Sequence, residues 1–269
     1  MVQAGPRDLV ELCPEVDPVL RQHRETQSPQ SISLASMKIA DPQMRLRTAW
    51  GYIDRQHNEL IAARLKGDRV LDVGCGYGSL VSYLSARGFA AEGIDSDPAS
   101  IPAAREMFPD ASVHLEGAES LSRYQDASFD SIVLKDALHH LVCEGDFRAS
   151  CEEFRRVLVP RGRLVVLDPN PMWILRLARR ISAHEDVAVG PKRALTVLAD
   201  NGFEVCGIAY YEVLGLPLSG GYVGLRLVPN LAFCNAAVAM TNRFASSIVN
   251  AMKLGRQLCW RYVIHANAK

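Results

Sequence analysis

The chain lacks an excess of either charge, because 30 lysines and arginines balance 30 aspartates and glutamates. Without a basic field to attract nucleic acid, no nucleic-acid partner is expected. The chain also lacks an uninterrupted apolar run of about 20 residues, so no transmembrane segment is expected. No basic-then-apolar signal pattern stands near residue 1. These absences predict a cytoplasmic protein.

Metal-ligating patterns are missing as well. The seven cysteines are scattered, and no CxxC pair or Cys/His ligand spacing joins them. We therefore expect reduced thiols and no metal site. The length of 269 residues and the hydrophobic content of 48% allow a sizeable core of the ordinary globular type.

The pattern that is present is an alternation of short apolar strands with helical stretches. Strands are expected over 69–74, 89–95, 112–117, 129–136, 162–169, 204–214 and 260–269, and helices over 44–65, 78–88, 97–108, 148–158 and 191–203. Asp97 is expected as an N-cap with Pro98 at the first helical position. Pro160 and Gly162 are expected to stop the helix before them. This alternation predicts an α/β, Rossmann-like, doubly wound fold: a mainly parallel seven-stranded sheet with helices on both faces.

The chain divides into three segments by composition. Residues 1–45 are broken by prolines and are expected to form an N-terminal segment of helix and loop. Residues 46–269 are expected to form the main domain. Within it, residues 215–258 form an apolar insertion before the last strand, far longer than the loop of an ordinary hairpin.

The insertion contains a stretch, 232–258, whose apolar residues follow a helical period. The expected contact positions are Ala232, Ala236, Val238, Met240, Phe244, Ile248, Met252 and Leu254. Four interpretations are open: a helix packed on the sheet edge, a lid over a hydrophobic acceptor, a dimer surface, and peripheral contact with a membrane. Because the stretch carries few lysines and arginines, we expect a lid or wall favouring an apolar or lipid-like acceptor.

The stretch "VLDVGCGYGSL", 70–80, places three glycines at alternate positions after the first expected strand. In doubly wound sheets the ligand binds at this edge. The stretch lacks the Lys-Ser or Lys-Thr of a P-loop and the third glycine of a dinucleotide motif. The carboxylate of Asp72 would repel a pyrophosphate and attract a cation, by roughly 4 kcal/mol at about 4 Å. Asp95 ends the second strand, where a carboxylate can bind both hydroxyls of a ribose.

Four blocks in order carry a resemblance to a known family: "VLDVGCGYG", "EGIDSD", "GAESLSRYQDASFDSIVLKDALHHL" and "LVPRGRLVVLDP". Over roughly 70–169 the chain resembles the class I S-adenosylmethionine-dependent methyltransferases, in particular the small-molecule, type 11-like group with the "LHHL" signature. The resemblance implies S-adenosylmethionine as cofactor, a small-molecule methyl acceptor and the Rossmann-like fold.

The resemblance implies a cofactor-binding role for ten residues: Asp72, Gly74, Cys75, Gly76, Gly78, Asp95, Ser96, Ala118, Glu119 and Lys135. In relatives the glycine turn approaches the methionine part of the cofactor, and the strand-end aspartate binds the ribose. Ser96, Ala118 and Glu119 would lie at the adenine, although Gly117 stands where many relatives have an aspartate. Lys135 is unusual at its place: it would pair with the cofactor's carboxylate, pair with an acidic substrate, or point to solvent.

Catalysis requires little acid–base chemistry, because methyl transfer from a sulfonium depends mainly on alignment and exclusion of water. A base is needed only for a hydroxyl or a protonated amine. The candidate catalytic residues are His140, in the "LHHL" signature, and His184, in "AHEDV". Alternatively, His140 has a structural role, with its ring bonded to backbone. His184 would alternatively lie in a solvated loop without a catalytic role.

Two other function classes stay open: a nicotinamide-dependent oxidoreductase on a similar fold, and a cofactor-binding protein without catalysis. The acidic rim around Asp72 disfavours the first, because a dinucleotide carries a diphosphate. Intact glycine and strand-end positions disfavour the second. We therefore expect an active small-molecule methyltransferase.

Overall fold

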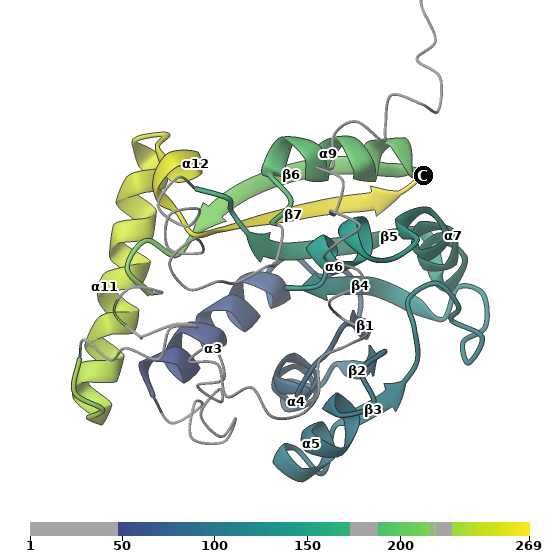
Figure 1. Ribbon diagram of the computed structural model, residues 1–269, viewed down its shortest axis with the longest axis horizontal. Coiled ribbons are helices and arrows are strands. Elements are labelled where there is room, and N and C mark those ends of the chain that lie inside the picture. Colours follow the sequence, from purple (N-terminus) through teal and green to yellow (C-terminus); the bar gives the residue numbers. More distant parts are fainter. Residues whose placement is uncertain (1–47, 173–187, 216–217, 219–227) are drawn as a thin grey trace, which may run out of the picture. The chain divides into compact units, whose positions relative to one another are not determined.

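The computed structural model describes residues 48–172, 188–215, 218 and 228–269, which belong to the second of two compact units, Lys38–Lys269. Seven strands form one sheet in the order β3-β2-β1-β4-β5-β7-β6 (Figure 1). The strands are β1 (Arg69–Val73), β2 (Ala90–Asp95), β3 (Ser112–Leu115), β4 (Phe129–Lys135), β5 (Leu158–Pro169), β6 (Phe203–Tyr211) and β7 (Arg261–Ala268). Strand β7 runs antiparallel to both of its neighbours, β5 and β6, and every other neighbouring pair is parallel. The predicted mainly parallel seven-stranded sheet is confirmed.

The strands place successive side chains on opposite faces of the sheet, and both faces are buried. In β1, Leu71 and Val73 belong to one core and Val70 to the other. The first core includes side chains of α6 (Leu138–Cys143), α7 (Phe147–Val157) and α9 (Pro191–Asp200); the second includes those of α3 (Ala49–Ala62), α4 (Ser79–Ser85) and α5 (Ser100–Met107). Helices therefore cover both faces, as predicted.

Helix α3 brings polar side chains into the interior. It begins after Thr48, whose hydroxyl accepts a hydrogen bond from the Trp50 N–H. Its buried face includes Gln56, His57 and Asn58 beside the expected apolar residues. Buried polar groups need partners, so this face of α3 must meet polar groups from other elements.

At two places a capping or breaker residue led to a wrong predicted boundary. Helix α5 begins at Ser100 rather than at Pro98, and the carboxylate of Asp97 accepts a hydrogen bond from the Ala99 N–H just before it. Strand β5 begins directly after α7 and runs through Pro160 and Gly162. Sheet pairing with β4 begins at Leu158, so tertiary pairing overrode the two breaker residues.

The stretch 232–258 forms two helices rather than one. Helix α11 (Ala232–Ala251) ends before Lys253, which has a left-handed φ of 59°, and α12 (Gly255–Leu258) follows. Of the expected contact positions, Val238 is buried, but Ala232, Met240, Phe244, Ile248 and Met252 are exposed. At these five positions the interpretation as packing contacts is wrong, because α11 packs on α3 and β6 through small and polar side chains. Within the described ranges, every helix is too short or too polar to cross a bilayer.

Candidate active site

The turn after β1 has a backbone that only glycine adopts easily. Gly74, Gly76 and Gly78 have φ values of 74°, 50° and 75°, in the left-handed region. A Cβ on Gly74 would lie 2.8 Å from the Cβ of Ala137, so this position needs glycine for space as well. The turn can therefore bring bare backbone against a ligand at the carboxyl edge of the sheet.

Asp95, at the end of β2, holds this turn in place. One carboxylate oxygen accepts a hydrogen bond from the Gly76 N–H at 2.8 Å, and the other accepts from the Asp97 N–H at 2.9 Å. Each carboxylate oxygen has a further lone pair. Asp95 can therefore support the turn and still accept hydroxyl groups of a ligand.

Asp72 lies beneath the turn with 1% of its surface exposed. Its Oδ1 is buried without a hydrogen-bond partner among the described residues. Burial raises the pKa of Asp72 to about 7, against the opposing charge of Lys135 and with help from Asp95 and Asp54. A buried, unsatisfied carboxylate of this kind is stabilised by a cation, and an ammonium group fits that requirement.

A pocket of about 610 Å³ opens beside the turn, within the usual size of small-molecule sites. Six of the predicted site residues line it: Gly74, Asp95, Ser96, Ala118, Glu119 and His140. The other predicted cofactor residues, which do not line it, are Asp72, Cys75, Gly76, Gly78 and Lys135. Cys75 is buried, and burial raises the pKa of its thiol, so it contributes packing rather than a reactive thiolate.

Lys135 does not point to solvent, and that interpretation was wrong. Its ammonium donates hydrogen bonds to Asp54 Oδ1 at 2.6 Å, to Asn58 Oδ1 at 2.7 Å and to Ser79 Oγ at 3.4 Å. These partners lie on α3 and α4, so Lys135 joins the end of β4 to the helices beside the glycine turn.

Comparisons with known proteins agree with this geometry. Residues 71–166 match a family model described as a methyltransferase domain. Phthiotriol/phenolphthiotriol dimycocerosates methyltransferase 1 of Mycobacterium ulcerans is 33% identical over 162 residues, which are 58% of this chain and 56% of that protein. A ubiquinone biosynthesis O-methyltransferase of Xylella fastidiosa is 33% identical over 132 residues, 48% of this chain and 52% of that protein. The chain spans about half the length of these curated relatives.

A solved structure has the same fold: a SAM-dependent methyltransferase from Archaeoglobus fulgidus, with a TM-score of 0.57 and 21% identity, covering 81% of this chain and 93% of that one. The chain carries a class I S-adenosylmethionine-dependent methyltransferase domain. The matched range includes the glycine turn, Asp95 and the "LHHL" segment. The cofactor of this domain is S-adenosylmethionine, and the oxidoreductase interpretation is therefore wrong.

The two histidines of the signature have different surroundings in the methyltransferase domain. His139 is buried, and its Nδ1 lies 2.9 Å from Oδ1 of the fully buried Asp168 at the end of β5. His140 lines the pocket with its side chain 48% exposed, and its Nδ1 lies 3.4 Å from Oε1 of Glu144. The buried histidine of the pair is thus His139, and its ring contacts a buried carboxylate. His184 lies outside the described residues.

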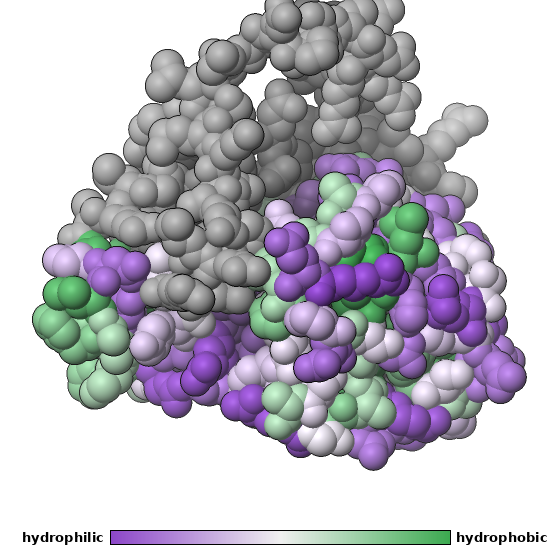
Figure 2. Space-filling view, turned by 90° about the horizontal axis from the view of Figure 1, so that it is seen from below, coloured by the Kyte–Doolittle hydropathy of each residue, from purple (hydrophilic) through white to green (hydrophobic). Residues whose placement is uncertain are grey.

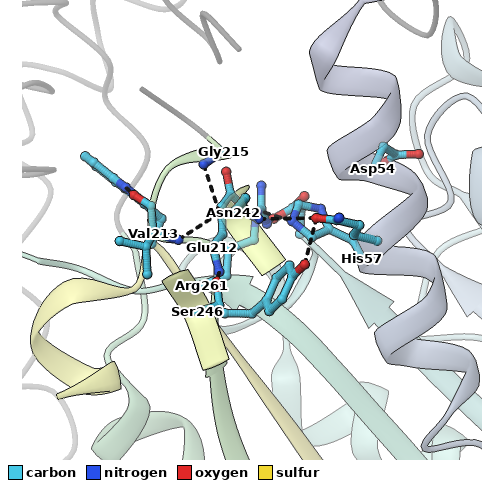
Figure 3. A network of polar contacts seen from close by, with 12 residues as sticks. Asp54, His57, Glu212, Val213, Gly215, Asn242, Ser246 and Arg261 are labelled. Carbon is cyan, nitrogen blue, oxygen red and sulfur yellow. Dashed lines mark hydrogen bonds and ion pairs between the residues drawn. The ribbon is translucent and has the colours of Figure 1, made fainter. Parts of the chain in front are cut away.

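Sequence reasoning missed a second charged group at the same edge of the domain. The buried Glu212 follows β6, and its Oε2 accepts a hydrogen bond from Arg261 Nε at 3.0 Å and lies 3.0 Å from His57 Nε2 (Figure 3). Arg261 also pairs with Asp136, which lines the pocket. The group therefore connects α3, β6 and β7 to the pocket wall.

Contacts within this group keep the carboxyl groups of Glu212 and Asp136 ionised. Burial raises the pKa of Glu212, but the hydrogen bond with His57 and the charge of Arg261 outweigh it, so the pKa lies below its usual value. Burial likewise raises the pKa of Asp136, and Arg261 again lowers it below the usual range. Both carboxyls are ionised at neutral pH. Both residues also have left-handed φ values, 58° for Asp136 and 71° for Glu212, a strain that clusters at functional sites.

One sequence signal would have found part of this group. Ligands of doubly wound sheets bind at the carboxyl ends of the strands, so the residue after each such strand is a candidate site residue. Asp136 and Glu212 directly follow β4 and β6 at this edge. No signal points to His57, which is 155 residues from Glu212 and lies on a helix.

Proposed function

We propose that this chain transfers the methyl group of S-adenosylmethionine to a small, apolar or lipid-like acceptor. The residues proposed to hold the cofactor are Asp72, Gly74, Cys75, Gly76, Gly78, Asp95, Ser96, Ala118, Glu119 and Lys135. The acceptor is proposed to bind beyond the cofactor's sulfur, beside Asp136, His140 and Leu141 of the pocket wall.

The observation that carries the proposal is the buried carboxylate of Asp72 with an unpartnered oxygen beneath the glycine turn. An isolated buried carboxylate is costly, and a cationic ligand offsets that cost where a diphosphate would increase it. Asp95 supplies acceptor positions for the ribose hydroxyls, and Ser96, Ala118 and Glu119 line the pocket where the adenine would lie.

The cofactor, when bound, supplies a methyl group activated by its sulfonium. The residues of the chain bind and orient the two reactants and exclude water. His140 lines the pocket and can accept a proton from a hydroxyl or amine acceptor, with Glu144 beside its ring. His184 is a second candidate for the base that accepts this proton.

The acceptor class is supported by the pocket wall and by the relatives. Val73, Ala137 and Leu141 give the wall an apolar part beside its acidic residues, which suits an acceptor with an apolar body and one polar atom. The two curated relatives are named for phthiotriol/phenolphthiotriol dimycocerosates and for ubiquinone biosynthesis, both lipid-like molecules.

Two measurements test the proposal. Calorimetry should show uptake of S-adenosylmethionine and S-adenosylhomocysteine but not of NAD. Incubation with cofactor carrying a tritiated methyl group should then label a component of a lipid extract, while a water-soluble metabolite extract stays unlabelled. Uptake of NAD alone would contradict S-adenosylmethionine as the cofactor. Label in the water-soluble extract would contradict an apolar or lipid-like acceptor. Uptake of the cofactor without label in either extract would favour a non-catalytic protein.

A further inference from the structure

Helix α11 packs on the domain through its polar side. The residues it buries are Asn235, Val238, Ala239, Asn242 and Ser246, so three of the five are polar. Asn235 donates a hydrogen bond to Asn230 just before the helix, whereas Ala239, Asn242 and Ser246 bond to α3 and to the segment after β6. Gln56 of α3, for example, donates a hydrogen bond from Nε2 to the Ala239 carbonyl at 2.8 Å.

These contacts fix the rotation of α11 about its axis. Oδ1 of Asn242 accepts hydrogen bonds from the N–H groups of Val213, Leu214 and Gly215, each at 3.0 Å (Figure 3). Ser246 Oγ accepts one from the Glu212 N–H at 3.1 Å. Turning the helix would leave all four backbone donors unsatisfied, at a cost of about 1–3 kcal/mol for each buried group. The opposite side of α11 is therefore held outward.

That outward side is a continuous apolar stripe. Its members follow one another at spacings of three and four residues: Phe233, Ala237, Met240, Phe244, Ile248 and Ala251. Phe233, Met240 and Phe244 are 71%, 72% and 69% exposed. Hydrophobic residues gather over α11 at the left edge of Figure 2. At about 1.5 Å per residue the stripe is about 27 Å long, a larger apolar exposure than scattered surface residues produce.

The charged residues of the segment that carries the stripe are all basic. Between 228 and 260 the chain contains Arg243, Lys253 and Arg256 and no aspartate or glutamate. All three cations are exposed. Arg243 pairs with Glu59 of α3, while Lys253 and Arg256 follow the stripe in the chain, after the end of α11.

We propose that the outward face of α11 docks on the surface of an anionic membrane, with the stripe in the lipid interface and Lys253 and Arg256 against anionic headgroups. An apolar helix face with a basic rim binds in this way, parallel to the membrane plane. This inference goes beyond methyl transfer, because docking needs neither cofactor nor acceptor.

Charge decides between a membrane and a second copy of the chain. In a symmetric dimer the same patch meets itself. Arg243 already pairs with Glu59, so the α11 segment of a second copy would bring a further Lys253 and Arg256, and residues 228–260 contain no carboxylate to pair with them. Anionic headgroups supply that missing charge, at about 1 kcal/mol for each basic residue near the surface.

Vesicle co-sedimentation of the full chain tests the proposal, with vesicles of phosphatidylcholine alone and of phosphatidylcholine mixed with phosphatidylglycerol. We expect the chain to sediment mainly with the mixed vesicles. Phe244→Gln should lower the partition coefficient about tenfold on both vesicles, because it removes apolar burial. Lys253→Gln should lower it about fivefold on the mixed vesicles only.

Leu115→Gln is the matched control, because Leu115 is 54% exposed but lies on β3, and its vesicle binding should equal that of the unmodified chain. Unchanged binding of S-adenosylhomocysteine shows that each variant is folded and keeps this test separate from that of methyl transfer. Absence of sedimentation with either vesicle would overturn the proposal. So would a dimer in light scattering that Phe244→Gln converts to a monomer, since the stripe would then be a subunit interface.

Discussion

Lys135 and Asp54 form an ion pair of 2.6 Å that joins the end of β4 to α3 beside the glycine turn. The two side chains are only 11% and 13% exposed. Burial raises the pKa of Asp54, but the charge and hydrogen bond of Lys135 outweigh it and lower the pKa below its usual value. Lys135 thus balances the carboxylates around the glycine turn and ties α3 to them.

Removing the lysine should destabilise the domain. In Lys135→Met the carboxylate of Asp54 stays buried without its cation, so we expect the free energy of unfolding to fall by about 3 kcal/mol in urea denaturation. The matched control is Arg69→Gln, which breaks the exposed pair with Asp130 and should leave the free energy of unfolding nearly unchanged. Equal effects of the two substitutions would mean that the Lys135 pair is no stronger than a surface pair.

Cofactor binding should depend on pH through Asp72. Since its pKa is raised to about 7, the carboxyl is protonated at lower pH and loses its attraction for a cation. The Kd for S-adenosylmethionine should therefore fall about tenfold as the pH rises through 7. Calorimetry across this range measures the change. Asp72→Asn should bind weakly and without this dependence, whereas Asp110→Asn, at an exposed position outside the pocket, should behave like the unmodified chain.

The same carboxyl should also affect stability without cofactor. Its folded pKa lies above the unfolded value of 3.8, so it stabilises the fold at low pH and loses that contribution as the pH rises toward 7. We therefore expect Asp72→Asn to melt at a higher temperature than the unmodified protein at pH 8, in scanning calorimetry without ligand. A lower melting temperature at that pH would show that Asp72 is not an uncompensated buried charge.

Local patterns were sufficient to predict the sheet. Mostly apolar runs such as 70–73 and 131–134 are buried on both faces, and glycine or proline marks most of the element ends. The strand order and the single reversed strand were not predicted, because they depend on pairing between strands that lie far apart in the chain. Pro160 misled the prediction because its strand lies next to β4, and pairing across the sheet cannot be read from one segment.

The orientation of α11 could not be predicted from its own residues. Its sequence has two stripes at helical spacing, one apolar from Phe233 to Ile248 and one polar through Asn235 and Asn242. Hydrophobic periodicity selects the apolar stripe for the interior. The polar stripe is buried instead because the backbone after β6 needs acceptors, and that need appears only when residues about 28 positions apart meet.

The glycine turn can be tested with two alanine substitutions at similar backbone angles. Gly74→Ala and Gly88→Ala both place a side chain at a left-handed φ, 74° and 87°, and each should cost about 1–2 kcal/mol in the free energy of unfolding. Only at Gly74 does the new Cβ approach another residue, at 2.8 Å from Ala137, beside the pocket. We expect calorimetry to show at least about a tenfold weaker binding of S-adenosylhomocysteine for Gly74→Ala alone. Equal affinity in both variants would place the cofactor elsewhere.

The two histidines of the signature should separate stability from catalysis. His139→Ala leaves the buried Asp168 with only the long 3.5 Å hydrogen bond from Tyr262. Burial already raises the pKa of that carboxyl, so we expect a loss of about 3 kcal/mol in the free energy of unfolding. His140→Ala removes a half-exposed ring and should leave stability and cofactor affinity unchanged. If His140 is the base, its kcat should fall about 100-fold for a hydroxyl acceptor, a typical contribution of proton transfer. An unchanged kcat would assign the proton to another group or to water.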